Sequence, residues 1–547
     1  VPKWHEEHLP IEDRPVLVLF DGWNSLFRDH VVPWRIGMAV KTRQQFETDT
    51  LPRYIETQRW FAGKGQAVEQ ARVTDSAMWE RGEGSFLLQL VTLDGLQEPQ
   101  SYFLPLSIAW EDDDEARMRT LAVSAVARVR QQAFVGVMAD AFADEHFCRG
   151  VVSAIGERLV LPSEGGELRF VPTAAFEGVA GSDHDTLEVS RPQAQSSNTI
   201  VTLGERLFLK GYRRLRPGVN PEYEIGRFLT DVAEFRHCVP VAGVLEHVAA
   251  GGERTTLALV QSYVSNQGDG WAYTLGYLQR FFELQRSTAE PMPADVHAAF
   301  YELVQTLGRR TAQLHQALGL RTGDAAFDPE PMTAADVADA VRQTAAQARS
   351  VLGLLEEHLP QLQGRALEDA QALLQRREAL LQRIQATADV GERGQKIRIH
   401  GDYHLAQVLL VKNDFVIVDF EGEPGRGFEE RRAKQSPLRD VAGMLRSFSY
   451  ASESGLRAAM QVPGESAQLP ELATQWEAGA RAAFLQAYAE VGAPGAAGTT
   501  LDPAQGLLSL YVLDKALYEL RYELGNRPDW VGIPLRGILD QLNQQDR

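Results

Sequence analysis

The pattern of apolar and polar residues divides the chain into a strand-rich part and a helix-rich part. In the first part, short apolar runs end at glycine or acidic turns, as at residues 85–93 and 101–108, and this pattern predicts β-strands. A helix is predicted over residues 41–55. Residues 1–40 hold one short apolar run among Pro, Trp and His residues, so we expect a linker or the end of a preceding unit.

Residues 186–275 have the pattern of a small sheet with one helix. Residues 199–203 and 206–210 are predicted to pair as a hairpin, because the Gly-Glu pair between them favours a tight turn. Asn220 and Pro221 predict the start of a helix, as its N-cap and its first helical residue. The apolar stripe of this helix comprises Ile225, Phe228, Leu229 and Val232.

The chain from residue 276 onward is predicted to be mainly helical. Apolar residues at helical spacing cover residues 294–318, 334–359 and 366–386. The last two of these stretches are expected to form a helical hairpin, because Pro360 and Gly364 interrupt the pattern between them. Short apolar runs predict strands at residues 397–400, 408–411 and 415–418.

Asp402, Gln407 and Asp419 form the pattern with the clearest chemistry. Asp402 and Gln407 lie five positions apart, and Asp419 follows a short apolar strand. A kinase-like fold uses this spacing to hold a hydroxyl nucleophile beside a metal-bound nucleoside triphosphate. Asp402 is predicted to accept the hydroxyl proton, and Gln407 and Asp419 offer the oxygens that Mg²⁺ prefers. A turn cap or an ion pair with arginine would explain a single aspartate, but not all three residues.

Lys210 adds an independent indication of nucleotide binding. It ends an apolar strand, where a positive charge is costly without an anionic partner. A kinase-like fold places a lysine there to hold the α- and β-phosphates, steadied by a helix glutamate. Glu222 and Glu224 both flank the apolar stripe of the next helix, and we favour Glu224. The alternative is a strand-end lysine whose ammonium group reaches solvent.

Two further segments are candidate nucleotide contacts. The first is the glycine-free loop before the hairpin, whose hydroxyl, amide and backbone N–H groups could hold phosphate; a purely structural polar loop explains it almost as well. The second follows the buried strand predicted at residues 257–260, and its backbone could read an adenine edge. The candidate residues are Ser196, Ser197, Asn198 and Thr199 in the loop, and Gln261, Tyr263 and Val264 after the strand.

The composition indicates a soluble protein of a reducing compartment. The net charge of −19 argues against a nucleic-acid partner, and 44% apolar residues are enough for real cores. Cys148 and Cys238 are the only cysteines, so a disulfide framework is excluded. We find no apolar run of membrane-spanning length and no signal peptide, and therefore expect a cytoplasmic protein without a membrane partner.

With these motifs in place, the chain resembles the bacterial maltokinases, which are relatives of the aminoglycoside and choline kinases. The resemblance runs from about residue 40 to the end. It rests on the motifs QRWFAGK (58–64), SSNT (196–199), RPGVNPE (216–222), GDGW (268–271), HGDYHLAQ (400–407), DFEGEP (419–424) and NRPDW (526–530). It implies an α+β, bilobal, protein-kinase-like (aminoglycoside-phosphotransferase-like) fold. The expected parts are a cap subdomain at 41–185, a small ATP-binding lobe at 186–275 and a helix-rich C-terminal lobe at 276–547.

The resemblance also implies a reaction. The γ-phosphate of ATP, with Mg²⁺, would pass to the anomeric hydroxyl of maltose and give maltose 1-phosphate for α-glucan (glycogen) synthesis from trehalose. Asp402 carries over as the base, and Gln407 and Asp419 carry over as metal ligands, although Asn is commoner at the Gln407 position. Some family members are fused behind trehalose synthase. Residues 1–40, which begin with Val rather than Met, are expected to be such a junction.

A disaccharide site needs planar polar groups and an aromatic face. Candidates near the base are His404, Arg439 and Asp440, and those in the C-terminal helix region are Lys515, Glu519, Tyr522 and Arg527. Helical spacing would place Lys515, Glu519 and Tyr522 on one face, although a surface helix with ion pairs explains them almost as well. Trp60 is predicted to be a core aromatic of the cap.

Two other functions fit parts of this pattern. The first is the same fold acting on another sugar, such as glucosamine. The second is a catalytically inactive module that binds sugar or anchors trehalose synthase. The complete set of Lys210, Asp402, Gln407 and Asp419 argues against the inactive module, because an inactive copy need not keep all four.

Overall fold

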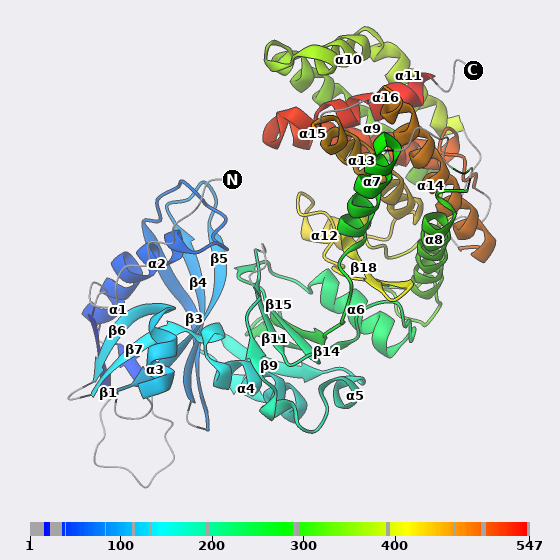
Figure 1. Cartoon of the computed structure of the whole chain (residues 1–547). Helices are drawn as coiled ribbons and strands as arrows, with labels where there is room; N and C mark the ends of the chain where they lie inside the picture. Colours follow the sequence, from blue (N-terminus) through cyan, green and yellow to red (C-terminus); the bar gives the residue numbers. More distant parts are fainter. Residues whose placement is uncertain are drawn as a thin grey trace. The chain divides into compact units, whose positions relative to one another are not determined.

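The chain folds into two compact units. The computed structural model describes residues 16–21, 36–38, 40–82, 84–111, 115–131, 134–192, 197–287, 293, 295–389, 394–462, 467–493 and 499–543. Unit 1 comprises Val1–Asp231 with Val239–Val264, and unit 2 comprises Val232–Cys238 with Ser265–Arg547. Figure 1 labels the elements of both units, and each unit is described by itself.

Unit 1 begins with an eight-stranded, mostly antiparallel sheet of order β2-β1-β6-β7-β5-β4-β3, with β13 paired to β5. Its strands are β1 (Val16–Asp21), β2 (Ile36–Met38), β3 (Gln70–Arg81), β4 (Gly84–Asp94), β5 (Gln100–Trp110), β6 (Ala125–Gln131), β7 (Phe134–Asp140) and β13 (Arg214–Leu215). A continuous helical segment packs on it, made of α1 (Val40–Gln45), a π-helical turn (Phe46–Thr50) and α2 (Leu51–Thr57). A further helix, α3 (Glu115–Ala122), contacts β7.

These elements confirm the helix predicted at 41–55 and the strands predicted at 85–93 and 101–108. Of residues 1–40, which we expected to be a linker or the end of a preceding unit, the described segments include two strands of this sheet, since β1 pairs with β6 and β2 pairs with β1. Trp60 is a core residue, as predicted: it is buried and its ring centroid lies 5.4 Å from that of Tyr102.

The second sheet of unit 1 has seven strands in the order β10-β11-β12-β15-β14-β9-β8. The strands are β8 (Val160–Pro162), β9 (Gly166–Pro172), β10 (Val189–Ser190), β11 (Thr199–Leu203), β12 (Leu207–Gly211), β14 (Val241–Ala249) and β15 (Arg254–Ser262). Its helices are α4 (Glu145–Glu157), α5 (Phe176–Ala180) and α6 (Pro221–Asp231), with 3-10 turns at Ala141–Ala143 and His184–Thr186. This sheet begins at β8, so it takes in residues that we expected in the cap, before position 186.

The predicted hairpin is present as β11 and β12. Gly204 in its turn has a φ of +55°, a conformation that glycine adopts without strain. Helix α6 begins as predicted, because the side chain of Asn220 accepts a hydrogen bond from the N–H of Glu222 at 2.8 Å. The stripe prediction is wrong at Val232, which lies beyond the end of α6 and is 48% exposed.

Unit 2 is a bundle of helices with two short antiparallel strand pairs, β16–β17 and the hairpin β18–β19. The helices are α7 (Gly270–Ser287), α8 (Ala298–Leu318), α9 (Ala334–His358), α10 (Gly364–Gln375), α11 (Arg377–Ala386), α12 (Phe428–Arg432), α13 (Leu438–Met460), α14 (Leu469–Val491), α15 (Gly506–Asn526) and α16 (Gly532–Asn543). The strands are β16 (Glu330–Pro331), β17 (Gln395–Lys396), β18 (Val408–Val411) and β19 (Asp414–Ile417). 3-10 turns lie at Leu359–Gln361, Thr387–Asp389, Leu405–Gln407 and Pro528–Trp530.

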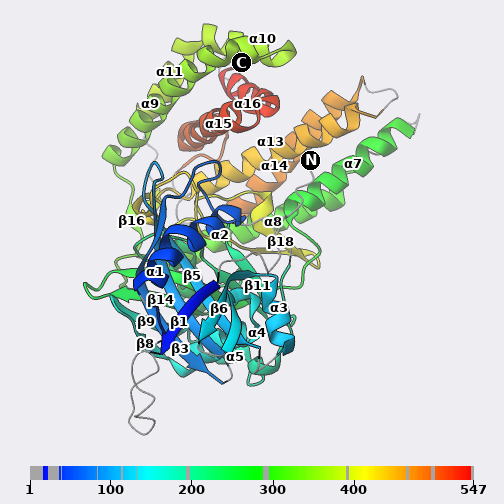
Figure 2. The same cartoon turned by 90° about the vertical axis from the view of Figure 1, so that its left-hand side faces the viewer.

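Helix α13 is the centre of this bundle. It packs against α7, α14 and α15, and α15 in turn packs against α9 and α16 (Figure 2). Most residues of α13 from Leu438 to Ser452 are buried, because neighbours surround the helix on several sides. The loop that follows β17 crosses this buried helix, so α13 supplies a rigid support for the residues of the candidate site.

Two predictions in unit 2 are wrong in detail. Residues 366–386 form two helices rather than one, because the chain leaves helical geometry at Arg376 (φ −99°, ψ 18°). Residues 397–400 do not form a strand: only Ile397 makes a bridge, to Gln435, and the next residues belong to a loop. The strand pair β18–β19 is present, one residue earlier at β19 than predicted.

Both cysteines, Cys148 and Cys238, are buried and free. Burial raises the pKa of each thiol to about 12, so both stay protonated at neutral pH. Among the described residues, no helix combines the length and the apolar character that crossing a bilayer requires.

Candidate functional site

The buried carboxylate of Asp440 fixes the loop that carries Asp402. Its Oδ2 accepts a hydrogen bond from the backbone N–H of His400 at 2.8 Å, and its Oδ1 accepts one from Gly401 at 2.9 Å. The ring of His315 lies on the other side, with Nε2 at 3.1 Å from Oδ2. Gly401 has a φ of +84°, which a residue with a side chain rarely adopts. Asp440 therefore fixes the backbone of the two residues that precede Asp402.

This position corrects the prediction that Asp440 contacts the sugar. Asp440 is 1% exposed, and both of its oxygens are used inside the protein. Burial alone raises the pKa of this carboxyl group, but the hydrogen bond and charge of His315 and the Gly401 N–H outweigh burial and lower it. Asp440 is a positioning residue for the loop.

Asp402 lies between two basic side chains. Its Oδ1 is 3.4 Å from Nζ of Lys515, and its Oδ2 is 3.8 Å from Nε2 of His404. His404 also begins the 3-10 turn that follows, since its Nδ1 accepts the N–H of Ala406 at 3.2 Å. Burial lowers the pKa of His404, although Asp402 raises it in part. The structure thus brings together three residues predicted from the sequence: Asp402, His404 and Lys515.

Gln407 and Asp419 are also neighbours, as the metal prediction requires. Nε2 of Gln407 donates to Oδ2 of Asp419 at 3.0 Å. Asp419 has a φ of +65°, an uncommon backbone conformation that places its carboxylate beside the 3-10 turn at Leu405–Gln407.

The donor set of these two residues fits Mg²⁺. Two oxygens bound to one octahedral Mg²⁺ at about 2.1 Å stand roughly 3 Å apart. A half-turn of the Gln407 amide would put its oxygen in place of Nε2, at that separation from Asp419. Amide orientation follows the hydrogen-bond partner that is present, so the same two side chains can serve either arrangement.

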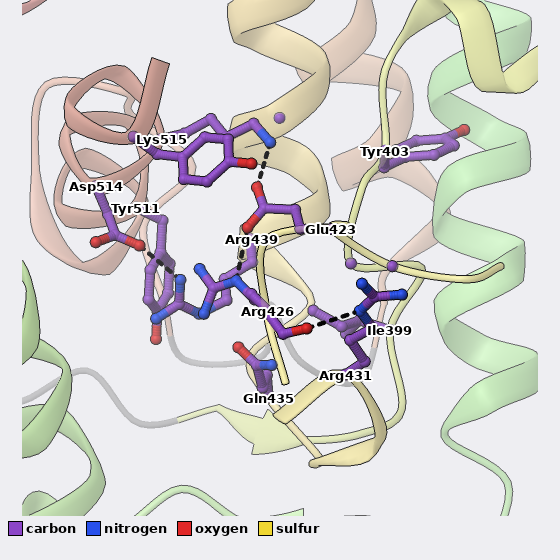
Figure 3. Close-up of a pocket in the computed structure, with 14 residues that line it drawn as sticks. Ile399, Tyr403, Glu423, Arg426, Arg431, Gln435, Arg439, Tyr511, Asp514 and Lys515 are labelled. Carbon is purple, nitrogen blue, oxygen red and sulfur yellow. Dashed lines mark hydrogen bonds and ion pairs between the residues drawn. The ribbon is translucent and has the colours of Figure 1, made fainter. Parts of the chain in front are cut away.

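A small polar cavity lies beside Asp402 in unit 2 (Figure 3). It is lined by Ile399, Gly401, Tyr403, Gly422, Glu423, Arg426, Arg431, Gln435, Arg439, Gly443, Tyr511, Asp514, Lys515 and Tyr518. Its volume of about 30 Å³ is that of a hydroxyl-sized group. Two predicted residues, Arg439 and Lys515, line this cavity.

Glu423 is the central acid of the cavity. Lys515 and Arg426 both point at its carboxylate, and Nε of Arg426 is 2.6 Å from it (Figure 3). Burial raises the pKa of Glu423, but the charges of Lys515 and Arg426 outweigh burial and lower it. For Lys515 burial has the opposite effect and lowers the pKa, but the negative charges of Glu423 and Asp402 have the larger effect, so the pKa of Lys515 is raised. All three groups therefore stay charged at neutral pH.

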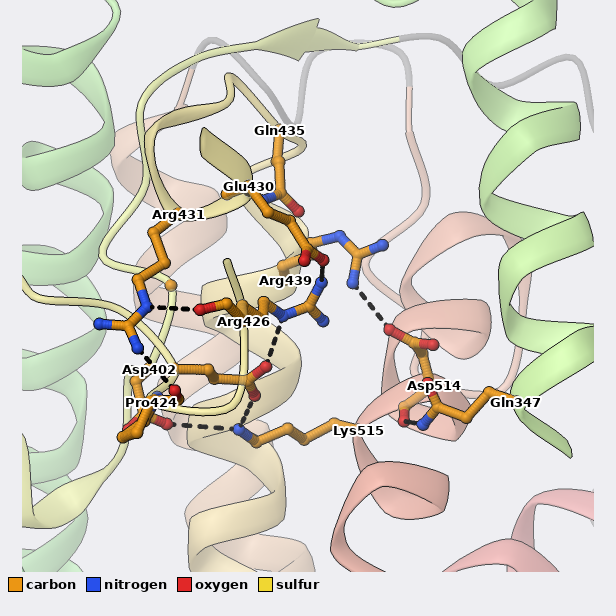
Figure 4. A network of polar contacts seen from close by, with 12 residues as sticks. Gln347, Asp402, Pro424, Arg426, Glu430, Arg431, Gln435, Arg439, Asp514 and Lys515 are labelled. Carbon is orange, nitrogen blue, oxygen red and sulfur yellow. Dashed lines mark hydrogen bonds and ion pairs between the residues drawn. The ribbon is translucent and has the colours of Figure 1, made fainter. Parts of the chain in front are cut away.

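Figure 4 shows how this network reaches Asp402 and the surrounding loop. Lys515 contacts both Asp402 and Glu423. Arg431 donates to the carbonyl oxygen of Pro424 at 2.6 Å, which fixes the loop after Asp419. Arg439 pairs with Asp514 at 2.7 Å and lies over the ring of Tyr511. Ion pairs therefore fix most of the charged side chains around the cavity: Lys515 with Asp402 and Glu423, Glu423 with Arg426, and Arg439 with Asp514.

The other predicted residues of the C-terminal helix region do not line this cavity. Glu519 accepts two hydrogen bonds from the buried Arg446, at 2.9 and 2.7 Å. Tyr522 is 45% exposed and lies beside Arg527, which pairs with Glu523 at 2.6 Å. Lys515, Glu519 and Tyr522, which we expected to share one face directed at the sugar, therefore lie in three different environments.

In unit 1, Lys210 makes an ion pair with Glu222, the glutamate that we did not favour. Nζ of Lys210 is 2.7 Å from Oε2 of Glu222, and the hydroxyl of Tyr212 donates to the same oxygen at 2.6 Å. Lys210 and Glu222 are both buried. The preference for Glu224 was wrong because the first turn of α6 directs Glu222 to the sheet, whereas Glu224 is half-buried and lines a different cavity.

The remaining nucleotide candidates have mixed outcomes. Ser196 lies outside the described residues, whereas Ser197 and Asn198 lead directly into β11. The hydroxyl of Thr199 accepts a hydrogen bond from Nε of Arg213 at 2.6 Å, so it has a structural partner. The N–H of Tyr263 donates to the carbonyl of Arg206 at 2.6 Å. Gln261 is paired within the sheet, and Val264 ends unit 1.

Sequence reasoning missed Glu423, Arg426 and Asp514 as site residues. The signal for Glu423 was present, because it lies in the motif DFEGEP next to Asp419. Arg426 lies three positions after Glu423, with which it pairs, but outside the motif. Asp514 gave no signal, because only the folded chain brings it close to its partner Arg439.

Comparisons with known proteins show what the chain is similar to. Residues 54–144 match the family model of the maltokinase N-terminal cap domain, which confirms the resemblance to maltokinases in this part of the chain. A glucosamine kinase of Streptacidiphilus jiangxiensis is 28% identical over 54% of this chain and 60% of that enzyme. A glucosamine kinase of Mycolicibacterium smegmatis is 26% identical over 63% of this chain and 78% of that enzyme. The match thus spans less than two thirds of the first relative.

Solved structures show the fold. Glucosamine kinase in crystal form B superposes with a TM-score of 0.57 at 21% identity, covering 87% of this chain and 94% of the other. Glucosamine kinase in complex with glucosamine, ADP and inorganic phosphate superposes with a TM-score of 0.56 at 20% identity, covering 90% and 99%. The predicted α+β, kinase-like fold with an N-terminal cap and a helical C-terminal region is therefore confirmed.

Asp440→Asn should destabilise the protein by about 2–3 kcal/mol. In the wild type each backbone N–H meets a carboxylate oxygen, whereas in the variant one of them would face the NH₂ group of the amide, and two donors cannot pair. Urea unfolding at pH 7 measures this loss, with the exposed Asp339→Asn in α9 as a control that should change little. The folded-state pKa of Asp440 lies below that of the unfolded chain. Its contribution is therefore complete above about pH 4 and is lost as the pH falls further, so the difference between wild type and variant should shrink there. A constant difference down to pH 3 would contradict this assignment.

Gly443→Ala should disturb the Asp402 loop, because the added Cβ would lie 2.6 Å from the carbonyl oxygen of Tyr403. We expect a loss of about 1–3 kcal/mol in stability and faster amide hydrogen exchange in residues 401–407. Gly353→Ala in α9 is the matched control, since its Cβ meets nothing within 4 Å and the change should stabilise the helix by about 0.5–1 kcal/mol. Equal behaviour of the two variants would show that α13 does not position the loop.

Proposed function

We propose that this chain is an ATP-dependent sugar kinase that transfers the γ-phosphate of ATP to the anomeric hydroxyl of maltose. The observation that carries the proposal is the setting of Asp402, with Lys515 and His404 at its two oxygens and a loop anchored by Asp440. The match of residues 54–144 to the maltokinase cap domain supports maltose as the acceptor. The kinase names of the relatives support the reaction class.

In the proposed reaction, Asp402 accepts the proton of the acceptor hydroxyl. The hydroxyl oxygen then bonds to the γ-phosphorus, while the bond from phosphorus to the β–γ bridging oxygen breaks and ADP leaves with that oxygen. The Lys515 ammonium group, 3.4 Å from Asp402, holds the carboxylate in one orientation. Orientation of this kind accounts for a large part of the rate enhancement in phosphoryl transfer.

The nucleotide is assigned to two sets of residues. Lys210, held by Glu222, is proposed to contact the α- and β-phosphates, and Ser197 and Asn198 offer donors at the start of β11. Gln407 and Asp419 would hold Mg²⁺, whose chemistry is to neutralise the phosphate charge. Glu224 has no part in this assignment.

The reacting end of the acceptor is assigned to the cavity beside Asp402, whose volume of about 30 Å³ has room for one hydroxyl group of the sugar. Glu423, Arg426 and Lys515 are charged side chains held in place by hydrogen bonds to one another. When a sugar binds, its hydroxyl groups can replace some of these hydrogen bonds. Tyr518 lines the same cavity and offers an aromatic face. His404 and Arg439 stand beside these groups, whereas Glu519, Tyr522 and Arg527 are not assigned to the sugar.

A second candidate is glucosamine kinase activity. The relatives at 28% and 26% identity carry this name, and the acidic Glu423 would suit an amino group. The cap-domain match favours maltose. A role in glycogen synthesis from trehalose, with a trehalose synthase as partner or fusion, and a cytoplasmic location follow from the resemblance and the composition alone. The inactive module remains the alternative from another class.

A panel of acceptors tests the proposal directly. ADP release is measured in a coupled assay with ATP, Mg²⁺ and maltose, glucosamine or glucose, and the phosphorylated product is identified by ³¹P NMR. We expect turnover with maltose and a product phosphorylated at the anomeric position. Strong turnover with glucosamine and none with maltose would replace the proposed acceptor, and no turnover with any sugar would favour the inactive module.

Asp402→Asn should lower turnover by at least ~10²-fold and leave ATP binding intact, because the amide cannot accept the hydroxyl proton. Steady-state kinetics with the preferred sugar and ATP titration calorimetry measure the two effects. Asp339→Asn, an exposed acid of the same unit, serves as the control and should retain full activity. Turnover of Asp402→Asn like that of the wild type would remove Asp402 from the role of base.

A further inference from the structure

A second, larger cavity lies wholly within unit 1, between helix α6 and the sheet of β9, β14 and β15. Its volume is about 310 Å³, which is in the range of small-molecule sites. It is lined by Arg169 and Val171 of β9, Val219, Tyr223, Glu224 and Arg227 at α6, Glu246 of β14 and Arg254 of β15. Figure 1 shows α6 beside β14, the strand that it contacts. None of these residues belongs to the proposed kinase machinery.

Three guanidinium groups reach this cavity from three separate elements. Arg169 and Arg254 come from β9 and β15, which flank β14 on either side, and Arg227 comes from the exposed side of α6. The side chains of Arg169 and Arg254 are 38% and 50% exposed, so they can turn toward a ligand. Against these three positive charges the lining offers two carboxylates, Glu224 and Glu246. Within the lining the arginines outnumber the carboxylates by one, and Arg169 also pairs with Glu167 of the same strand.

Glu246 explains why the arginines gather there. Its side chain is 5% exposed, and Arg254 donates to it at 3.3 Å. Arg169 is its direct cross-strand partner. Burial raises the pKa of Glu246, and the charges of Arg254, Arg169 and Arg227 lower it in part. Of the three arginines, Arg254 bonds to this carboxylate, whereas Arg169 pairs with Glu167. A guanidinium group has five N–H donors, more than these contacts use.

The lining also supplies an apolar surface and a hydroxyl donor. Val171, Val219 and Tyr223 belong to a cluster with the buried residues of β14 and β15. Burial raises the pKa of Tyr223, so its hydroxyl keeps its proton, and this side chain also interacts with Arg227. A cavity that combines cationic donors with apolar surface suits an anion that carries an organic group.

We propose that this cavity binds the phosphate group of a phosphate monoester. Tetrahedral phosphate oxygens can accept hydrogen bonds from guanidinium groups that approach from three directions, whereas a flat carboxylate presents only one edge. The volume exceeds that of free phosphate, so the ester group occupies the remainder beside Val171 and Val219. Tyr223 and Arg227 belong to α6, the helix that also carries Glu222, the partner of Lys210.

Titration calorimetry of the full chain with glucose 6-phosphate and with inorganic phosphate tests this proposal. Arg227→Gln and Arg254→Gln should each weaken binding by ~10-fold or more, because each removes a charge-assisted hydrogen bond. Arg72→Gln is the matched control: it removes an exposed arginine of the same unit that pairs with Asp94 at 3.2 Å, and binding should be unchanged. Lys210→Met and Lys515→Met, which alter the proposed kinase site, should also keep the binding.

The outcomes separate this site from the proposed kinase function. Tighter binding of the sugar phosphate than of inorganic phosphate supports an ester as the occupant, and equal affinities support recognition of the phosphate group alone. Wild-type affinity in both Arg227→Gln and Arg254→Gln overturns the proposal. So does binding that is lost only in Lys210→Met or Lys515→Met, or binding of succinate as tight as that of either phosphate compound. None of these results depends on catalytic activity.

Discussion

The buried carboxylate of Asp440 is the contact on which the site in unit 2 depends. It accepts two successive backbone N–H groups, of His400 and Gly401, and so fixes the direction in which the chain leaves for Asp402. The ring of His315 contacts the same carboxylate through Nε2. Because an unpaired buried N–H costs free energy of its own, the loop has one low-energy path rather than several. The proposed role of Asp402 therefore depends on a buried residue whose own oxygens are used inside the protein.

Charge pairing extends this order to the groups around Asp402. Lys515 contacts both Asp402 and Glu423, and Glu423 contacts Arg426, so three elements share one network. Partly buried ions of this kind contribute little net stability, but each fixes the direction of the next. The result is a preorganised set of donors and acceptors next to the proposed base, which is what phosphoryl transfer requires of a protein.

Local patterns were predictable from the sequence, and contacts between distant residues were not. The β11–β12 hairpin and the start of α6 follow from Gly204 and Asn220, whose effects act within a few residues. The strand predicted at residues 397–400 is absent because the bonds to Asp440 outweigh an apolar run. The choice between Glu222 and Glu224 depended on the rotation of α6 relative to the sheet. Lys515 and Glu519 lie in different environments, because Glu519 pairs with Arg446 of α13.

The central claim is that Asp402 and Asp419 serve the same phosphoryl transfer, the first for the alcohol and the second for the metal. The most direct test is ADP titration calorimetry of Asp419→Ala with and without Mg²⁺, since wild-type affinity should depend on the metal. Our account predicts that the variant binds ADP weakly and equally under both conditions. An affinity that rises with Mg²⁺ as much as in the wild type would contradict it.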